Sequence, residues 1–189
     1  MRYLALGDSY TIGTGASSAE RAWPSILAAR LGADLTNPAV NGYTTEDLIR
    51  DELPLLRKLR PNVVTVLIGV NDLVQGRSPE SYRASLRTIY EEVVVGADAF
   101  AVSIPTWSYT PAAADFGGAA HVARLTELFN AVASEEAARL GIEWIDIGRV
   151  STSRIGTPGW LAPDQLHPGD AQHLAWAEVI WPKVRDRLR

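Results

Sequence analysis

The chain contains no cysteine, no long apolar run and no cluster of basic residues. Without cysteine it can form no disulfide, use no thiolate nucleophile and offer no thiolate ligand to a metal ion. No apolar stretch approaches the roughly 18 residues that a membrane span needs. Eighteen Lys and Arg stand against 22 Asp and Glu, a formal net charge of −4, with no basic run of the kind that binds nucleic acid. We therefore expect neither a membrane span nor a nucleic-acid partner.

Several motifs of catalytic and nucleotide-binding sites are also missing. There is no G-x-S-x-G nucleophile elbow, which argues against the α/β-hydrolase fold, and no S-x-x-K. H-E-x-x-H and clustered histidines are absent, so we expect no metal. The stretch "GTG" at 13–15 is too short for a dinucleotide fingerprint, and there is no phosphate-binding G-x-x-x-x-G-K-[ST] loop. We expect the protein to work without a cofactor.

What is present is typical of a globular α/β protein. The 189 residues are 47% hydrophobic and 21% charged, which predicts one domain spanning residues 1–189. Short apolar runs alternate with helical patterns, and this alternation predicts a three-layer α/β fold with a parallel sheet. The predicted strands are 2–6, 33–37, 62–68, 98–104 and 142–147. The predicted helices are 22–31, 44–59, one that starts at Pro79, 119–140, and one that starts near Gly169.

Several local features refine this prediction. Thr44 and Asp47 have the spacing of a capping box, and Pro54 is expected to kink or split the helix that follows. Residues 105–118 form an irregular stretch longer than most loops, which indicates a functional or mobile segment. The first strand begins at Arg2 and leaves no room for a signal peptide, so a cytoplasmic location is the default expectation.

The last helix carries its own predictions. Leu174, Ile180, Val184 and Leu188 are expected to face the core, and Pro182 is expected to kink the helix.

Reactive residue types follow four of the five predicted strands. Ser9 comes after the first strand, Gly42 after the second, Asn71 after the third, and Asp164 and His167 after the fifth. In open α/β sheets, ligands bind beyond the carboxyl ends of the strands, so these residues are expected at one edge of the sheet. The sequence therefore predicts a single site at this edge.

A serine hydroxyl needs a base within hydrogen-bond reach, and His167 is the histidine best placed to be that base. Asp164 lies three residues upstream, where a tight turn can aim its carboxylate at one ring nitrogen, as in a Ser-His-Asp triad. The N–H groups of Ser9 and Gly42 and the side-chain amide of Asn71 are candidate donors of an oxyanion hole. The other histidines, in or next to helices, suit surface or packing roles.

These motifs resemble those of the GDSL or SGNH hydrolases. "GDSY" at 7–10 corresponds to the first block, with Tyr10 where the family name has Leu, and "NG" at 41–42 is similar to the lone-glycine block. "GVND" at 69–72 matches G-x-N-D, and "DQLH" at 164–167 matches D-x-x-H. The resemblance implies a flavodoxin-like αβα sandwich and a metal-free hydrolase of small-molecule esters. It also implies Ser9, Gly42, Asn71 and His167 as the name-giving residues.

Structural interpretations remain open for single residues. Ser9 can be a helix N-cap, Asn71 an Asx-turn residue and Gly42 a turn glycine, and Asp170 can cap the last helix. The aromatic residues Trp107, Tyr109, Phe116 and Trp160 can line an acyl pocket or merely pack a loop, and are left out of the predicted site.

The predicted function is a serine esterase that works through an acyl-Ser9 intermediate. Three alternatives are an acyltransferase that uses the same site, a non-catalytic, flavodoxin-like ligand-binding module, and a catalytically silent scaffold. The second would leave "DQLH" without a role.

Overall fold

A five-stranded parallel sheet forms the centre of the computed structural model, which describes residues 1–188. The strand order is β2-β1-β3-β4-β5. The strands are β1 (Arg2–Gly7), β2 (Asp34–Thr36), β3 (Val63–Leu67), β4 (Asp98–Val102) and β5 (Glu143–Ile145). Every residue of β3 is buried, as its nearly continuous run of β-branched residues predicts for a central parallel strand. The five predicted strands and their parallel arrangement are confirmed.

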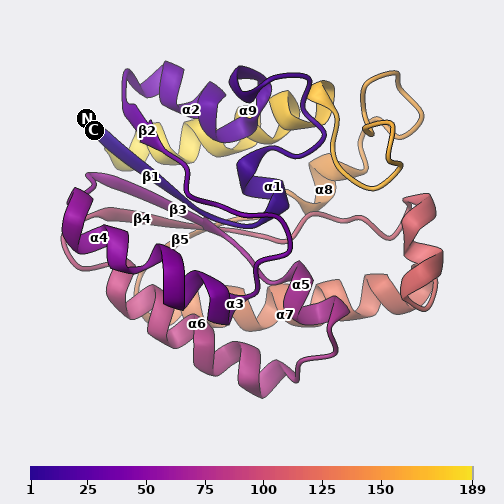
Figure 1. Cartoon of the computed structure of the whole chain (residues 1–189), viewed down its shortest axis with the longest axis horizontal. Coiled ribbons are helices and arrows are strands. Elements are labelled where there is room, and N and C mark those ends of the chain that lie inside the picture. Colours follow the sequence, from indigo (N-terminus) through magenta and orange to yellow (C-terminus); the bar gives the residue numbers. More distant parts are fainter. Residues whose placement is uncertain (189) are drawn as a thin grey trace.

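Helices cover both faces of the sheet and produce the predicted αβα sandwich (Figure 1). On one face, α2 (Trp23–Leu31) packs against α9 (Asp170–Arg187). On the other face lie α4 (Pro54–Leu59), α6 (Pro79–Val93) and α7 (Ala119–Arg139), and α6 packs against α7. The chain leaves β1 toward β2 on one side and returns to β3 on the other. This reversal of strand order opens a crevice beyond the carboxyl ends of β1 and β3.

Short helices in addition to the five predicted ones lie mostly beyond the carboxyl ends of the strands. They are α1 (Ser9–Ile12), α5 (Val70–Val74), α8 (Gly148–Ser151) and 3₁₀ turns over Ala19–Arg21 and Pro111–Phe116. The predicted alternation of five strands with five helical segments is present, and these short helices are additions to it. Segments of three to six residues make too few turns to show a helical period in the sequence. The irregular stretch 105–118 contains one of them, the 3₁₀ turn that ends at Phe116.

The predicted helix over 44–59 is split, as Pro54 leads one to expect. The capping box is confirmed, because Thr44 accepts a hydrogen bond from the Asp47 amide and Asp47 accepts one from the Thr44 amide. After α3 (Thr45–Asp47) the chain makes a π-helical turn over Leu48–Glu52, and α4 then begins at Pro54. Proline has no N–H to donate to the preceding turn, so the helical ladder is interrupted at this position.

One prediction for the last helix is wrong. Leu174 is 47% exposed, and His173 is fully buried in its place, whereas Ile180 and Val184 face the core as predicted. At about 100° per residue, His173 lies within about 20° of Ile180 on the helical wheel and Leu174 about 120° away. Leu188 is half-buried against the core, and α9 runs as one helix across Pro182.

Over residues 1–188, no helix has both the length and the apolar character required to cross a bilayer. The expected cytoplasmic location stays a prediction.

Candidate active site

Ser9 is the first residue of α1, directly after the carboxyl end of β1. The N-cap is Asp8, whose carboxylate accepts a hydrogen bond from the Tyr10 amide at 3.0 Å. Ser9 is therefore not the N-cap of α1. Its side chain is 8% exposed and faces a cavity.

The tight turn that presents Ser9 requires glycine at position 7. Gly7 has φ +156°, and a Cβ there would lie 2.2 Å from the Leu67 carbonyl oxygen and 2.3 Å from Thr11 Oγ1. Because β3 and α1 both press against this backbone, no larger residue fits without displacing one of them. Gly7 thus holds Ser9 close to the end of β3, where α5 begins.

Asp164 and His167 form a pair within one turn. Asp164 Oδ2 lies 2.6 Å from His167 Nδ1, the contact that the sequence predicts. Asp164 Oδ1 accepts hydrogen bonds from the amides of Leu166 at 3.0 Å and His167 at 2.9 Å. Partial burial acts to raise the pKa of Asp164, but these hydrogen bonds together outweigh it and hold the pKa below its usual range. The carboxylate is therefore ionised near neutral pH and can fix a proton on Nδ1.

The turn that carries His167 is tied to the loop after α1. Ser17 donates to Asp170 from both its amide and its hydroxyl, at 2.8 and 2.7 Å. A Cβ on Gly15 would lie 2.4 Å from the Pro168 carbonyl oxygen and 2.9 Å from His167 Cβ, so the two loops are in close contact. Asp170 therefore joins these two loops.

Asn71 and Gly42 lie on neighbouring segments. Asn71 is in α5, and its Nδ2 donates to the Tyr43 carbonyl oxygen at 2.8 Å. An amide nitrogen carries two hydrogens, so the second remains for a ligand. Gly42 has φ +83°, and a Cβ there would meet nothing within 4 Å. Glycine is favoured here because the backbone is left-handed, and the space that a Cβ would occupy is open.

One cavity of about 220 Å³ brings four of the five predicted residues together. Ser9, Gly42, Asn71 and His167 all line it, and Asp164 lies behind His167. Among the described residues 1–188, no hydrogen bond joins the Ser9 hydroxyl to the His167 ring. Such bonds are often long in the absence of a ligand.

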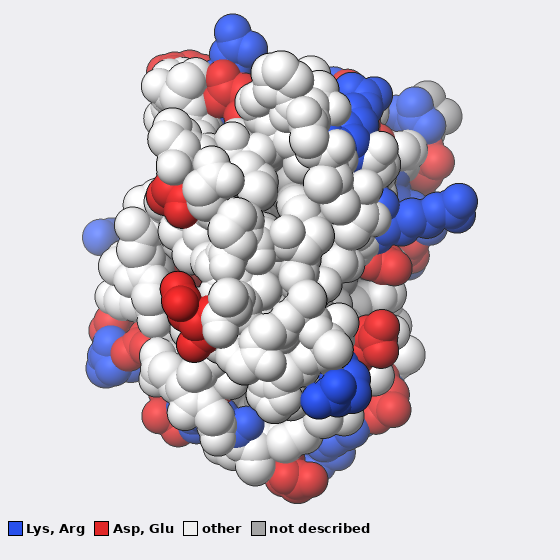
Figure 2. Space-filling model, turned by 90° about the vertical axis from the view of Figure 1, so that its right-hand side faces the viewer, with Lys and Arg blue, Asp and Glu red and all other residues white. Residues whose placement is uncertain are grey.

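Apart from Asn41, the remaining wall of this cavity is apolar. It consists of Tyr10, Val70, Val74, Trp107, Phe116 and Leu166. Figure 2 views this end of the molecule, and the middle of the face is largely free of Lys, Arg, Asp and Glu. Tyr10, at the position where the motif departs from the family name, packs edge-on against the His167 ring at 6.0 Å. The cavity suits an uncharged, partly apolar ligand.

Of the four aromatic residues left out of the predicted site, two belong to the cavity and two do not. Trp107 and Phe116 line it and contact each other edge to face at 5.6 Å. Trp160 instead donates its indole N–H to the Ser151 carbonyl, and Tyr109 accepts a hydrogen bond from Gln172. The position of 105–118 directly after β4, at the same sheet edge, is the signal that could have identified the first two.

Buried carboxyl groups lie behind Ser9, and one of them was not anticipated. Glu52, in the π-helical turn, accepts a hydrogen bond from the Gly7 amide at 2.9 Å. Burial raises the pKa of Glu52 to about 8 and that of Asp8 to about 7. Asp72 is also fully buried and accepts two hydrogen bonds from Thr45, whereas Asp8 accepts one from the Tyr10 amide.

Two further observations concern the surroundings. A second cavity of about 390 Å³, between α7 and the segment after β5, shares Trp107 with the first but contains none of the five predicted residues. Within residues 1–188, no three His, Cys, Asp or Glu side chains are grouped so that they could hold a metal ion.

Comparison with known proteins gives relatives along nearly the whole chain. The sequence is 27% identical over 172 residues to thioesterase 1/protease 1/lysophospholipase L1 of Escherichia coli K12, a match that covers 89% of this chain and 76% of the relative. It is 22% identical over 195 residues to esterase TesA of Pseudomonas aeruginosa, covering 98% and 88%.

Solved structures share the fold. The crystal structure of TesA superposes with a TM-score of 0.78 at 23% identity, over 98% of this chain and 99% of that one. The lipase/acylhydrolase of Enterococcus faecalis gives a TM-score of 0.77 at 22% identity, over 99% and 97%.

The profile of the GDSL-like lipase/acylhydrolase family matches residues 5–175, a range that contains Ser9, Gly42, Asn71, Asp164 and His167. This match and the relatives indicate an enzyme that hydrolyses esters, which sets aside the non-catalytic binding module. The chain belongs to the GDSL-like lipase/acylhydrolase family.

Proposed function

We propose that the protein is a serine esterase that hydrolyses carboxylic esters through a covalent acyl-Ser9 intermediate. The observation that carries this proposal is the cavity that Ser9, Gly42, Asn71 and His167 share, with His167 held by Asp164 at 2.6 Å. A nucleophile, a base, an orienting carboxylate and oxyanion donors thus meet at one apolar pocket.

In the first half of the reaction, Ser9 Oγ attacks the ester carbonyl carbon while His167 Nε2 takes the hydroxyl proton. The N–H groups of Ser9 and Gly42 and the free N–H of Asn71 bind the oxygen that becomes negative. Asp164 keeps the proton on Nδ1 and stabilises the imidazolium. The tetrahedral intermediate then breaks its bond to the alcohol oxygen, which receives the proton from His167.

In the second half, water takes the place of the alcohol. His167 removes a proton from the water as its oxygen attacks the acyl carbon, and the collapse of this intermediate returns a proton to Ser9 Oγ. The products are the free acid, the alcohol and the unmodified enzyme.

The substrate is proposed to be a small, uncharged ester with its acyl group against the apolar wall. The relatives are named as an esterase, a thioesterase and a lysophospholipase, so simple esters, thioesters and lysophospholipids are the classes to compare. An acyltransferase would use the same residues with an alcohol in place of water, and product analysis with added glycerol separates the two.

The experiment is hydrolysis of p-nitrophenyl acetate, butyrate, octanoate and palmitate, without added metal, by wild type and Ser9→Ala. We expect turnover in wild type and its loss in Ser9→Ala. Ser153→Ala is the matched control, because Ser153 donates to the Val150 carbonyl and does not line the cavity. Activity that survives in Ser9→Ala, or is absent from folded wild type with every ester, would exclude the acyl-Ser9 mechanism.

A further inference from the structure

The segment that carries Gly42 is attached to α5 by side chains that the reaction itself does not use. We propose that Asp72 is a positioning residue that holds the Gly42 amide in place relative to Asn71. We call the hydrogen bonds that join Asn71 and Asp72 to Tyr43 and Thr45 the clamp, and Arg77 covers this clamp from the solvent side. This inference rests on the proposed function, because it assigns a task to residues next to the proposed oxyanion hole.

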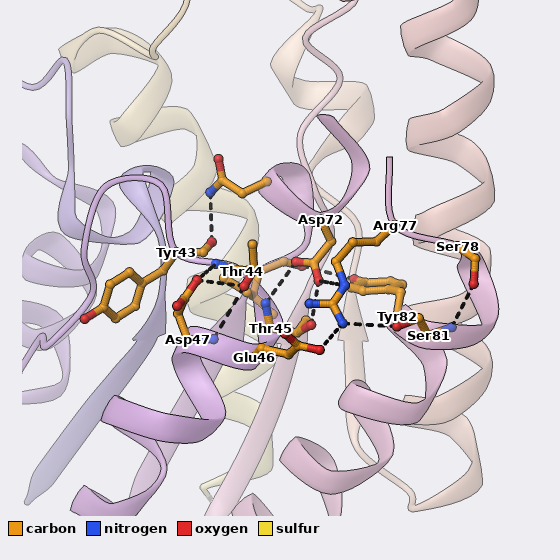
Figure 3. Close-up of polar contacts among 12 residues, drawn as sticks. Tyr43, Thr44, Thr45, Glu46, Asp47, Asp72, Arg77, Ser78, Ser81 and Tyr82 are labelled. Carbon is orange, nitrogen blue, oxygen red and sulfur yellow. Dashed lines mark hydrogen bonds and ion pairs between the residues drawn. The ribbon is translucent and has the colours of Figure 1, made fainter. Parts of the chain in front are cut away.

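Asp72 binds Thr45 with both of its carboxylate oxygens. The Thr45 amide donates to Oδ2 at 2.9 Å and the Thr45 hydroxyl to Oδ1 at 2.6 Å. Both residues are completely buried, so water does not compete for these hydrogen bonds. Figure 3 shows the Asp72 carboxylate directed from α5 across to Thr45 at the start of α3.

Asn71, the neighbouring residue in α5, binds the same segment. Asn71 Nδ2 donates to the Tyr43 carbonyl oxygen at 2.8 Å. Two adjacent side chains of α5 thus hold positions 43 and 45, directly after Gly42. These three hydrogen bonds fix positions 43 and 45 relative to α5 and so restrain the Gly42 amide beside them.

Arg77 closes the arrangement on the outside. Its amide donates to the Asp72 carbonyl oxygen at 3.0 Å, so the chain folds back over α5. Its Nε lies 3.6 Å from Asp72 Oδ1, and its guanidinium also pairs with Glu46 and donates to Ser81 Oγ at 3.0 Å. Arg77 therefore connects Glu46, in the first turn of α3, to the start of α6 (Figure 3).

The chemistry of the contact requires a carboxylate at position 72. Thr45 presents two donors, and only a carboxylate offers an acceptor to each of them. An asparagine would turn its NH₂ group toward one of these donors and leave that hydrogen bond unmade in a buried place. Asp72→Asn therefore loosens the clamp with almost no change in side-chain volume.

The test is the turnover per active site of Asp72→Asn, Thr45→Val and Thr45→Ser. Active sites are counted by the nitrophenolate released when a p-nitrophenyl phosphonate blocks the serine. If Asp72 only supported folding, its loss would lower the number of titrated sites. If it positions the oxyanion donors, the turnover of each titrated site falls, and kcat falls with little change in KM.

We expect kcat per site to fall about 10- to 100-fold in Asp72→Asn, the range that a misplacement of about 1 Å produces. In Thr45→Val, kcat per site should fall several-fold. In Thr45→Ser, which keeps the hydroxyl, kcat per site should remain close to that of wild type. Glu136→Gln is the matched control: Glu136 is also a buried carboxylate, but it binds Arg83, Arg87 and Arg139 on α6 and α7. Its kcat per site should not change.

Asp72→Asn and Thr45→Val with wild-type kcat per titrated site would overturn the clamp while leaving the esterase intact. If Asp72→Asn does not fold, Thr45→Val against Thr45→Ser decides. Failure of the proposed function looks different, because activity would then be absent from wild type or would persist in Ser9→Ala.

Discussion

Asp164 binds the Nδ1 of His167 at 2.6 Å with one carboxylate oxygen and two backbone amides of the same turn with the other. The group that orients the ring is therefore itself held in place by the backbone. Ring orientation and loop conformation depend on the same carboxylate, and both would be disturbed if its charge were removed.

For this reason we expect Asp164→Asn to lower kcat by about 10²- to 10⁴-fold, since an amide that donates to Nδ1 selects the wrong tautomer. Steady-state kinetics with p-nitrophenyl butyrate measure the loss. Asp186→Asn, an exposed position late in α9, serves as the control. Less than a threefold loss in Asp164→Asn would mean that another group orients His167.

The side-chain amide of Asn71 is expected to supply one oxyanion donor. Asn71→Ala should lower kcat by about 10²- to 10³-fold, the effect of removing one such donor. Asn62→Ala makes the same truncation at the opposite edge of the sheet, where Asn62 Oδ1 accepts from the Arg2 amide. Equal activity of the two variants would contradict the role of Asn71.

The two motif glycines at positions 7 and 42 should respond differently to alanine. Gly7→Ala places a Cβ against the Leu67 carbonyl and Thr11, so we expect a destabilisation on the order of 3 kcal/mol or more. Gly42→Ala meets nothing and adds only the strain of a left-handed alanine, about 1–2 kcal/mol. Urea unfolding of both variants checks the order, and a reversed order would show that β3 and α1 accommodate the methyl group.

The small apolar cavity predicts a preference for short acyl chains. We expect kcat/KM to be highest for acetate or butyrate and to fall toward palmitate, because about 220 Å³ is less than drug-sized pockets occupy. Phe116, 37% exposed, forms the outer wall. Phe116→Ala should raise the octanoate-to-butyrate ratio of kcat/KM by about 10-fold. Leu128→Ala, an exposed change on α7 away from the cavity, should leave this ratio unchanged.

Stability should depend on pH through Glu52. Burial raises the pKa of this carboxyl from 4.5 to about 8 in the folded chain. A group with a raised folded pKa gives its full contribution to stability below the unfolded value, and this contribution is lost as the pH rises from about 4.5 through about 8. Glu52→Gln resembles the protonated form of this carboxyl, and Asp8, whose pKa burial also raises to about 7, still titrates in the variant.

The free energy of unfolding of wild type should therefore fall between pH 5 and 8, and that of Glu52→Gln should fall about half as steeply or less. Chemical denaturation at several pH values measures both slopes. Parallel curves would show that Glu52 titrates in the folded chain as it does in the unfolded chain.

The sheet and the place of the site could be predicted because each depends on short-range patterns. The continuous apolar run of β3 predicts a central strand, and the position of Ser9, Asn71 and His167 after strands predicts one edge. The turn that joins Asp164 to His167 is local as well, and its key contact follows from a spacing of three residues.

What could not be predicted depends on contacts between distant segments. Glu52 lies at an apolar position of the helical period, four residues after Leu48, but its charge gives no sign of burial. The π-helical turn directs it to the Gly7 amide. The hydrogen bonds from Thr45 to Asp72 likewise arise from how separate loops pack. The same is true of the positions of Trp107, which lines the cavity, and Trp160, which does not. Leu174 shows the limit of periodic reasoning, because a buried histidine occupies the face assigned to it.

The hydrogen bonds from Ser17 to Asp170 also have a consequence for how the chain folds during synthesis. Ser9, the proposed nucleophile, is synthesised near the beginning of the chain, whereas His167 and the helix that follows it are synthesised near the end. The two meet only when α9 docks beside α2, a contact of high sequence separation that forms slowly. A nascent chain that has emerged only through β4 contains Ser9 but lacks His167, so under the proposed mechanism activity appears only when folding is complete.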